Sequence, residues 1–168
     1  MNPLSHLEKI LGYNFRTRAF LLTALRHRSY IHESTPTALS QQEEDNQLLE
    51  FLGDSVLSIC ISTLLYETFP GSKEGELSRM RAGLVNDARL GGIGREIGIP
   101  ACLILGRGEE TSGGREKNSI LADAFEAVLA AIYIDGGLVP CFEVVKLLFG
   151  DLLDRSSSQD LLMDYKTR

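Results

Sequence analysis

Residues 44–68 form the segment that most constrains how this chain can fold. They are apolar enough for a central, mostly buried helix, and the FPGS turn at 69–72 ends it. No window of the sequence has the sustained alternation of apolar and polar residues that is typical of strands. We therefore predict an all-α domain built around this helix.

Other segments also have the apolar spacing of helices. Asn2 can cap a first helix that has Pro3 in its first turn, and Asn86 can cap another. A glycine pair follows residue 135 and ends an especially apolar segment. Residues 106–118 are rich in glycine and charge, which predicts a loop. The expected helices cover about residues 3–11, 16–27, 44–68, 74–85, 87–97, 119–135 and 139–153.

Length and composition limit the class of protein. With 168 residues, of which 43% are hydrophobic, the chain suits one compact domain followed by a polar tail. The N-terminus lacks the long apolar run of a signal peptide, and we expect no segment to span a membrane. Cys60, Cys102 and Cys141 are widely spaced among apolar neighbours, which favours reduced core thiols over a disulfide or a CxxC metal site. A cytoplasmic location is therefore expected.

The charge balance restricts the partners. Acidic residues number 23 against 17 basic ones, which gives a net charge of −6. Phosphate backbones are held by Lys and Arg, so this balance alone argues against nucleic-acid binding. The argument fails if some of the acids hold metal ions, because bound cations can be the largest charges in a site. The positions of the acids therefore matter more than their number.

Two carboxylates stand out in the segment NQLLEFLGDSVL at 46–57. Glu50 and Asp54 are its only charged residues, and their spacing places them on one face of a helix. Like charges at this spacing repel, and burial disfavours their ionised forms unless a cation is present. The polar stripe on this face consists of Gln47, Glu50, Asp54 and Ser58.

A second apolar segment carries a similar pair. Asp123 and Glu126 are the only charged residues between positions 119 and 134, and they also share one helix face. If the two helices pack together, both pairs of acids can converge. The alternative is that Asp123 interacts with the dipole at its helix N-terminus and that the other acids are exposed or hydrogen-bonded singly. Glu126 lies too far into its helix for a dipole role, and the apolar neighbours of both pairs are untypical of a solvated face.

The ligand chemistry of these acids favours a hard divalent cation. Carboxylates without His or Cys select Mg²⁺ or Mn²⁺ rather than zinc. The sequence has no EF-hand loop, no Glu-x-x-His pair for a di-iron site and no Trp to stack on a sugar. Mg²⁺ typically engages phosphate oxygens, and two such ions can clamp an in-line displacement. The residues therefore indicate a metal-dependent phosphodiesterase or nuclease.

Four stretches together resemble the ribonuclease III family. NQLLEFLGDSVL is similar to that family's signature, N-E-R-L-E-F-L-G-D-S-V-L. The others are ALRHRSY at 24–30, EGELSRMRAGLVN at 74–86 and GRGEETSGGREKNSILADAFEAVLAAIYIDGG at 106–137. The resemblance covers about residues 5–155, and the combination is far more specific than any single motif.

The resemblance implies a fold, an activity and a site. It implies an all-helical bundle that works as a homodimer and cleaves double-stranded RNA with Mg²⁺, for which Mn²⁺ can substitute. Each subunit would cut one strand and leave 5′-phosphate and 3′-hydroxyl ends with short 3′ overhangs, as in the processing of ribosomal RNA precursors. The family's catalytic residues fall on Asp54 and Glu126. Its metal-binding acids fall on Glu50, Asp54, Asp123 and Glu126.

The chain departs from the family pattern at several positions. Gln47 stands where the family usually has Glu, Leu48 where it usually has Arg, and Arg26 where it often has Thr. Gln47 can still hydrogen-bond a water or a ribose but contributes no charge. Leu48 lacks a guanidinium that could have paired across a dimer surface. We expect Arg26 only to add surface charge.

Several polar residues are weaker candidates for RNA contact, with a solvated surface as the alternative interpretation. They are Gln47, Arg79, Arg81, Arg107, Arg115 and Lys117. Ser119 is expected to cap its helix. His27 and Ser29 are expected to hold the end of a helix and not to touch substrate.

Residues 1–155 are expected to form the catalytic domain, with a polar loop at 34–46. Residues 156–168 are hydrophilic and resemble the start of a linker to a double-stranded-RNA-binding domain, which the sequence does not include. Two other functions stay open. One is a non-catalytic dimeric RNA-binding or assembly module of the same fold, which Gln47 and the acidic balance favour. The other is a metal-dependent hydrolase of small phosphate compounds.

Overall fold

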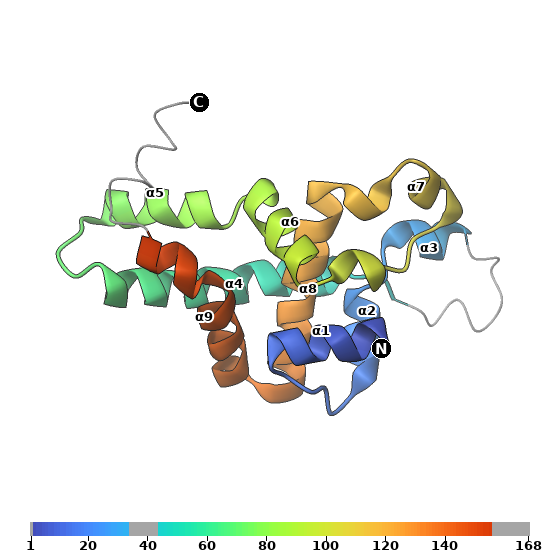
Figure 1. Cartoon of the computed structure of the whole chain (residues 1–168), viewed down its shortest axis with the longest axis horizontal. Coiled ribbons are helices and arrows are strands. Elements are labelled where there is room, and N and C mark those ends of the chain that lie inside the picture. The colour runs from blue at the N-terminus through green and yellow to red at the C-terminus, as the bar shows by residue number, and fades with distance from the viewer. Residues whose placement is uncertain (1, 34–43, 156–168) are drawn as a thin grey trace.

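The computed structural model describes residues 2–33 and 44–155, with side chains described as far as residue 153. Within these ranges the chain is all-α, as predicted, and a single bridge between Arg26 and Ile104 is the only extended pairing. Most of the expected loop at 34–46 lies outside the described residues. The whole of the tail at 156–168 lies outside them as well. The helices are α1 (Pro3–Leu11), α2 (Arg18–Ala24), α3 (Arg28–Glu33), α4 (Gln47–Thr68), α5 (Glu74–Leu84), α6 (Asp87–Glu96), α7 (Arg107–Thr111), α8 (Asn118–Gly136) and α9 (Leu138–Arg155), with 3₁₀ turns η2 (Ile99–Ala101) and η3 (Gly114–Glu116) (Figure 1).

Two of the predicted helix caps are present. The side chain of Asn2 accepts a hydrogen bond from the backbone N–H of Leu4 at 3.0 Å, with Pro3 in the first turn. The side chain of Asn86 accepts one from Arg89 N–H, also at 3.0 Å, and so begins α6. In both cases the cap satisfies a backbone donor that has no partner inside the helix.

Three local predictions were wrong. The single helix expected at 16–27 is interrupted after α2, because the backbone there pairs with Ile104 instead. The N–H of Ile104 donates to the carbonyl of Leu25, and the carbonyl of Ile104 accepts from the N–H of His27. The expected loop at 106–118 contains α7 and η3. Ser119 does not cap its helix, since α8 begins at Asn118.

Helix α8 lies at the centre of the hydrophobic core. Residues 127–132 of this helix have 0% exposed surface. It packs against α2, α4, α6 and α9, and Figure 1 shows it crossing α4 steeply near the middle of the molecule. The rings of Phe125 in α8 and Phe149 in α9 pack together, with their centroids 6.3 Å apart. Any side chain near this crossing is therefore held by the two best-packed helices.

By length and composition, helix α4 is long and apolar enough to cross a membrane. This differs from the expectation that no segment is long enough to span one. A buried core helix meets the same criteria. Here α4 packs against α5, α8 and α9. Its buried residues are Gly53, Val56, Leu57, Cys60, Ile61, Leu64 and Leu65. These contacts account for the apolar sequence of the side that faces the core.

Candidate metal centre

Two helices bring three of the predicted acids together. Helix α4 carries Glu50, and α8 carries Asp123 and Glu126. One carboxylate oxygen from each of these residues lies within 4.8 Å of the other two, and all three residues are partly buried. The convergence expected from the helical spacing is therefore present for these residues, which we call the carboxylate cluster. Their role as metal ligands stays a prediction.

Burial and mutual repulsion disfavour the ionised forms of the clustered acids. Burial is the main cause that raises the pKa of Glu126 to about 8, followed by the charges of Asp54 and Asp123. Burial also raises the pKa of Asp123 to about 6, with further contributions from Glu50 and Asp87. The pKa of Glu50 is raised by burial and then by the charge of Asp54. These carboxylates therefore need a nearby positive charge to be ionised together at neutral pH.

Asp54 borders the cluster without belonging to it. Its carboxylate is not among the three whose oxygens lie within 4.8 Å of one another, and the residue is exposed. Its charge nevertheless raises the pKa of both Glu50 and Glu126, after the larger effect of burial. Asp54 thus lies close to the clustered acids on their solvent side.

A glycine sets the separation between the two helices at this site. Gly53 is buried in α4 and packs directly against the backbone of Glu126 in α8. It precedes Asp54 and lies three residues after Glu50, so all of these acids surround one close helix crossing. A side chain at position 53 would occupy the space that the α8 backbone fills.

Two charged residues near the cluster were missed by sequence reasoning. Asp87, the first residue of α6, contributes to the raised pKa of all three clustered acids, below the effect of burial. Arg28, the first residue of α3, acts in the opposite direction on Glu50 and Asp123. An acid directly after a helix cap is ordinarily explained by the helix dipole, so Asp87 carried no separate signal. For Arg28, the only signal was its place in the ALRHRSY stretch.

Two of the three departures from the family pattern lie in the first turn of α4, and the third follows α2. Gln47 is exposed at the start of α4, where its backbone N–H donates to the Asp45 carboxylate at 3.0 Å. Leu48 is exposed as well. Arg26 does more than add surface charge, because its guanidinium donates to the carbonyl of Glu44 at 3.0 Å, just before α4.

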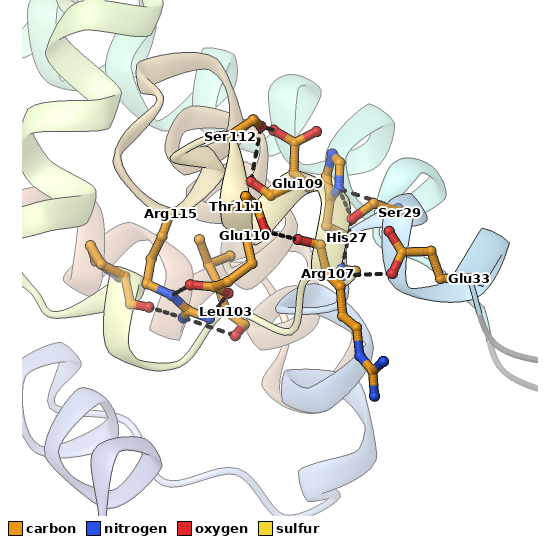
Figure 2. Close-up of polar contacts among 12 residues, drawn as sticks. His27, Ser29, Glu33, Leu103, Arg107, Glu109, Glu110, Thr111, Ser112 and Arg115 are labelled. Atoms are coloured by element: carbon orange, nitrogen blue, oxygen red, sulfur yellow. Dashed lines mark hydrogen bonds and ion pairs between the residues drawn. The ribbon is translucent and has the colours of Figure 1, made fainter.

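Arg115, one of the weaker candidates for RNA contact, has partners within the protein (Figure 2). Its guanidinium forms an ion pair with Glu110. It also donates to the backbone carbonyls of Pro100 and Leu103. This side chain therefore joins η2, α7 and η3, and any RNA contact would compete with these bonds.

The other basic candidates differ in how strongly they are held. The Lys117 ammonium pairs with Glu109 at 2.6 Å, and Arg81 donates to a serine hydroxyl of α4 at 2.9 Å. Arg79 and Arg107 are exposed. Contact of these side chains with RNA stays a prediction.

An apolar face covers the side of α4 that is opposite the core. Phe51 and Tyr66 are 77% and 75% exposed. Leu48 and Ile59 follow the same helical spacing and are also exposed. An apolar groove next to this face is lined by Ile59, Cys60, Thr63, Leu138, Val139 and Phe142. Exposed apolar surface of this extent is typical of a protein contact.

Known proteins resemble this chain in both sequence and structure. Residues 18–152 match the family described as ribonuclease-III-like. A ribonuclease 3 from Syntrophobacter fumaroxidans is 46% identical over 98% of this chain and 68% of its own length. One from Geobacter metallireducens is 44% identical over 97% of this chain and 65% of its own length. The chain thus spans about two thirds of the length of these relatives.

The nuclease domain of ribonuclease III from Campylobacter jejuni has a similar structure. The TM-score is 0.78 at 32% identity, and the match covers 88% of this chain and 96% of that one. In that domain, a region involved in dimer formation shows structural flexibility. The family match covers most of the chain, and the sequence relatives extend over nearly all of it. This chain belongs to the ribonuclease III family of endoribonucleases.

Proposed function

We propose that this chain cleaves double-stranded RNA by metal-dependent hydrolysis of phosphodiester bonds. The observation that carries the proposal is the meeting of Glu50, Asp123 and Glu126 on two apolar helices of a ribonuclease III-family chain. The proposed products have 5′-phosphate and 3′-hydroxyl ends and short 3′ overhangs. Precursors of ribosomal RNA are a proposed substrate.

The carboxylate cluster fits a hard divalent cation. It offers only oxygen ligands, and these lie close enough to share an ion. With a pKa of about 8, the carboxyl group of Glu126 keeps its proton at neutral pH unless a cation displaces it. We therefore propose Mg²⁺, with Mn²⁺ as a substitute. When bound, such ions activate a water and stabilise the negative charge on the leaving oxygen.

The proposed metal site lies where α4 and α8 cross. Contact with Gly53 holds the backbone of Glu126 against α4, while apolar neighbours exclude water from the α8 side. Asp54 lies on the solvent side of the cluster, from which a phosphate would arrive. We propose Asp54 and Glu126 as the catalytic residues, as the family resemblance implies.

A second copy of the chain is the proposed partner of the apolar face. The face contains Phe51 and Tyr66 and adjoins an apolar groove, so a symmetric pairing could bury the exposed side chains of both copies. The Campylobacter jejuni nuclease domain, which has a region involved in dimer formation, supports this proposal. Leu48, where the family usually has Arg, adds to the apolar character of the face.

A cytoplasmic location is also part of the proposal. Cys60, Cys102 and Cys141 are all buried and free. Reduced thiols of this kind suit a reducing compartment.

Cleavage of an end-labelled RNA duplex, with single-stranded RNA as substrate control, tests the proposed activity. We expect cutting of the duplex with Mg²⁺ or Mn²⁺, no cutting with EDTA, and loss of cutting in Glu126→Gln. Glu96→Gln is the matched control, because Glu96 is an exposed acid at the far end of α6. Equal cutting by wild type and Glu126→Gln would contradict the site assignment.

Two further measurements on the same protein, duplex binding and nucleotide hydrolysis, separate the rival functions. Binding of the duplex without any cleavage would favour the non-catalytic RNA-binding module. Hydrolysis of nucleotides without cutting of the duplex would favour a hydrolase of small phosphate compounds.

A further inference from the structure

Arg28 is a cation that lies beside the carboxylate cluster. It begins α3, its side chain is exposed, and it forms no hydrogen bond or ion pair with another residue of the described ranges. Several other basic side chains are engaged within the protein. Arg18, Arg95, Arg115 and Lys117 all form ion pairs with glutamates. The charge of Arg28 is therefore not paired with any residue of the described ranges.

Backbone hydrogen bonds tie the segment before Arg28 to the first turn of α4. The backbone N–H of Asn46 donates to the carbonyl of Arg26 at 2.9 Å, and its buried side chain donates to the carbonyl of Ala24 at 3.2 Å. Glu50 N–H in turn donates to the carbonyl of Asn46 at 2.8 Å. Arg28 is two residues beyond this junction and Glu50 is one helical turn beyond it. Both are thus held at the same end of α4.

The residues on either side of Arg28 are anchored as well (Figure 2). His27 N–H donates to the carbonyl of Ile104 at 3.0 Å. The hydroxyl of Ser29 accepts a hydrogen bond from Gly106 N–H at 2.9 Å and lies 2.8 Å from Nδ1 of His27. The backbone is therefore held on both sides of Arg28. His27 and Ser29 hold the start of α3, as expected, because the backbone N–H of Ser29 donates to Nδ1 of His27 at 3.2 Å. That neither residue touches substrate stays a prediction.

The positive charge of Arg28 favours the ionised forms of two acids in the carboxylate cluster. Burial dominates and raises the pKa of both Glu50 and Asp123, but the guanidinium of Arg28 acts against this effect at both residues. The other charges near these acids, Asp54 and Asp87 among them, are negative. A polyanion that approaches this site would therefore meet strong repulsion unless cations lie at its edge.

We propose that Arg28 is a substrate-binding residue whose guanidinium holds an RNA phosphate next to the bond that is cleaved. This inference rests on the proposed function and adds a residue to it. A guanidinium is always charged and can donate two parallel hydrogen bonds to a phosphate, which a point charge cannot reproduce. The alternative is that Arg28 serves as a fixed counter-ion for the acids. In that case its loss would change metal binding and leave RNA binding unaltered.

The test compares Arg28→Gln and Arg28→Lys with the wild type on duplex RNA. Cleavage is measured at saturating Mg²⁺, and RNA binding is measured by fluorescence anisotropy in a Glu126→Gln background that prevents cutting. Arg16→Gln is the matched control, since it removes the same charge at the opposite end of α8, where the backbone of Arg16 contacts Asp135. Mg²⁺ titrations of the cleavage rate and thermal unfolding are recorded for every variant.

We expect Arg28→Gln to lower kcat/KM and RNA affinity roughly tenfold or more, as for loss of a hydrogen-bonded charge. A plot of log affinity against log salt concentration should become less steep by about one unit for each RNA phosphate contact that is lost. Arg28→Lys should retain an intermediate affinity, and Arg16→Gln should match the wild type. Unfolding temperatures should stay unchanged.

Two results would overturn the inference while leaving the proposed function intact. One is wild-type RNA affinity and cleavage in Arg28→Gln. The other is a shifted Mg²⁺ midpoint with a wild-type rate at saturating metal, which would identify a counter-ion. If the wild-type chain neither binds nor cuts the duplex, the proposed function fails and the inference fails with it.

Discussion

Gly53 in α4 lies directly against the backbone carbonyl of Glu126 in α8. A Cβ atom built on Gly53 would overlap that carbonyl oxygen. The obstacle is backbone and cannot rotate away as a flexible side chain could. This one contact therefore fixes how the acids of the two helices meet.

Replacement of Gly53 by alanine should separate the two helices. We expect Gly53→Ala to destabilise the fold by about 3 kcal/mol or more, because the added methyl group forces backbone movement in a packed core. Cleavage should fall sharply as well. Urea unfolding and RNA cleavage measure the two effects.

The matched control for this change is Gly92→Ala. Gly92 is in α6 and has nothing within 4 Å of an added Cβ. Alanine is the better helix former by up to about 1 kcal/mol, so this variant should be neutral or slightly stabilised. Equal stability of the two variants would contradict the role of Gly53.

The stability of the metal-free protein should depend on the protonation of Glu126. Its pKa is raised, mainly by burial, from 4.5 to about 8 on folding. Between these values the folded state binds more protons than the unfolded state, so stability should fall as pH rises from about 4.5 to about 8. Glu126→Gln should remove much of this slope and should be more stable than wild type at pH 8 in EDTA.

Urea midpoints measured in EDTA across this pH range test the prediction. Glu96→Gln should keep the wild-type slope, since Glu96 is exposed and lies at the far end of α6. Added Mg²⁺ should stabilise the wild type at pH 8, because it binds the ionised carboxylates of the folded state. An unchanged slope in Glu126→Gln would show that the carboxyl group titrates normally.

A charge placed in the apolar face should weaken self-association. Phe51 is 77% exposed on α4, so a lysine there should be tolerated by the isolated fold. We expect Phe51→Lys to raise the dimer dissociation constant by a hundredfold or more, roughly the loss of a central aromatic contact. Analytical ultracentrifugation gives the constant. Lys9→Asp in α1 is the surface control, and a dimer that persists in Phe51→Lys would contradict this interface.

Arg115 should mainly stabilise the fold and not bind RNA. Its guanidinium donates to the carbonyls of Pro100 and Leu103 and pairs with Glu110. We expect Arg115→Gln to cost about 2 kcal/mol of folding free energy, because backbone acceptors lose a charged donor. Arg107→Gln, a change to an exposed arginine in the same segment, should have little effect on stability. If Arg115→Gln is as stable as wild type but binds RNA less well, the side chain is an RNA contact instead.

Helical spacing alone was enough to predict that acids of α4 and α8 converge. The charged pairs in α4 and α8 interrupt otherwise apolar segments, and a carboxylate on a buried face is unusual enough to be informative. The carboxylate cluster of Glu50, Asp123 and Glu126 confirms that these faces meet. The helix caps at Asn2 and Asn86 could also be predicted from the sequence, because a cap depends only on residues within one helical turn.

The features that sequence reasoning missed depend on contacts between distant segments. The helix expected at 16–27 ends early because Ile104, far along the chain, takes over its backbone hydrogen bonds. Asp87 and Arg28 are ordinary surface charges in the sequence, and they matter only because α6 and α3 are placed beside the clustered acids. Composition and periodicity thus determined the helices and the faces that carry the acids. Only the tertiary structure decided which charges surround the site, because electrostatic effects depend on distance in space and not on spacing along the chain.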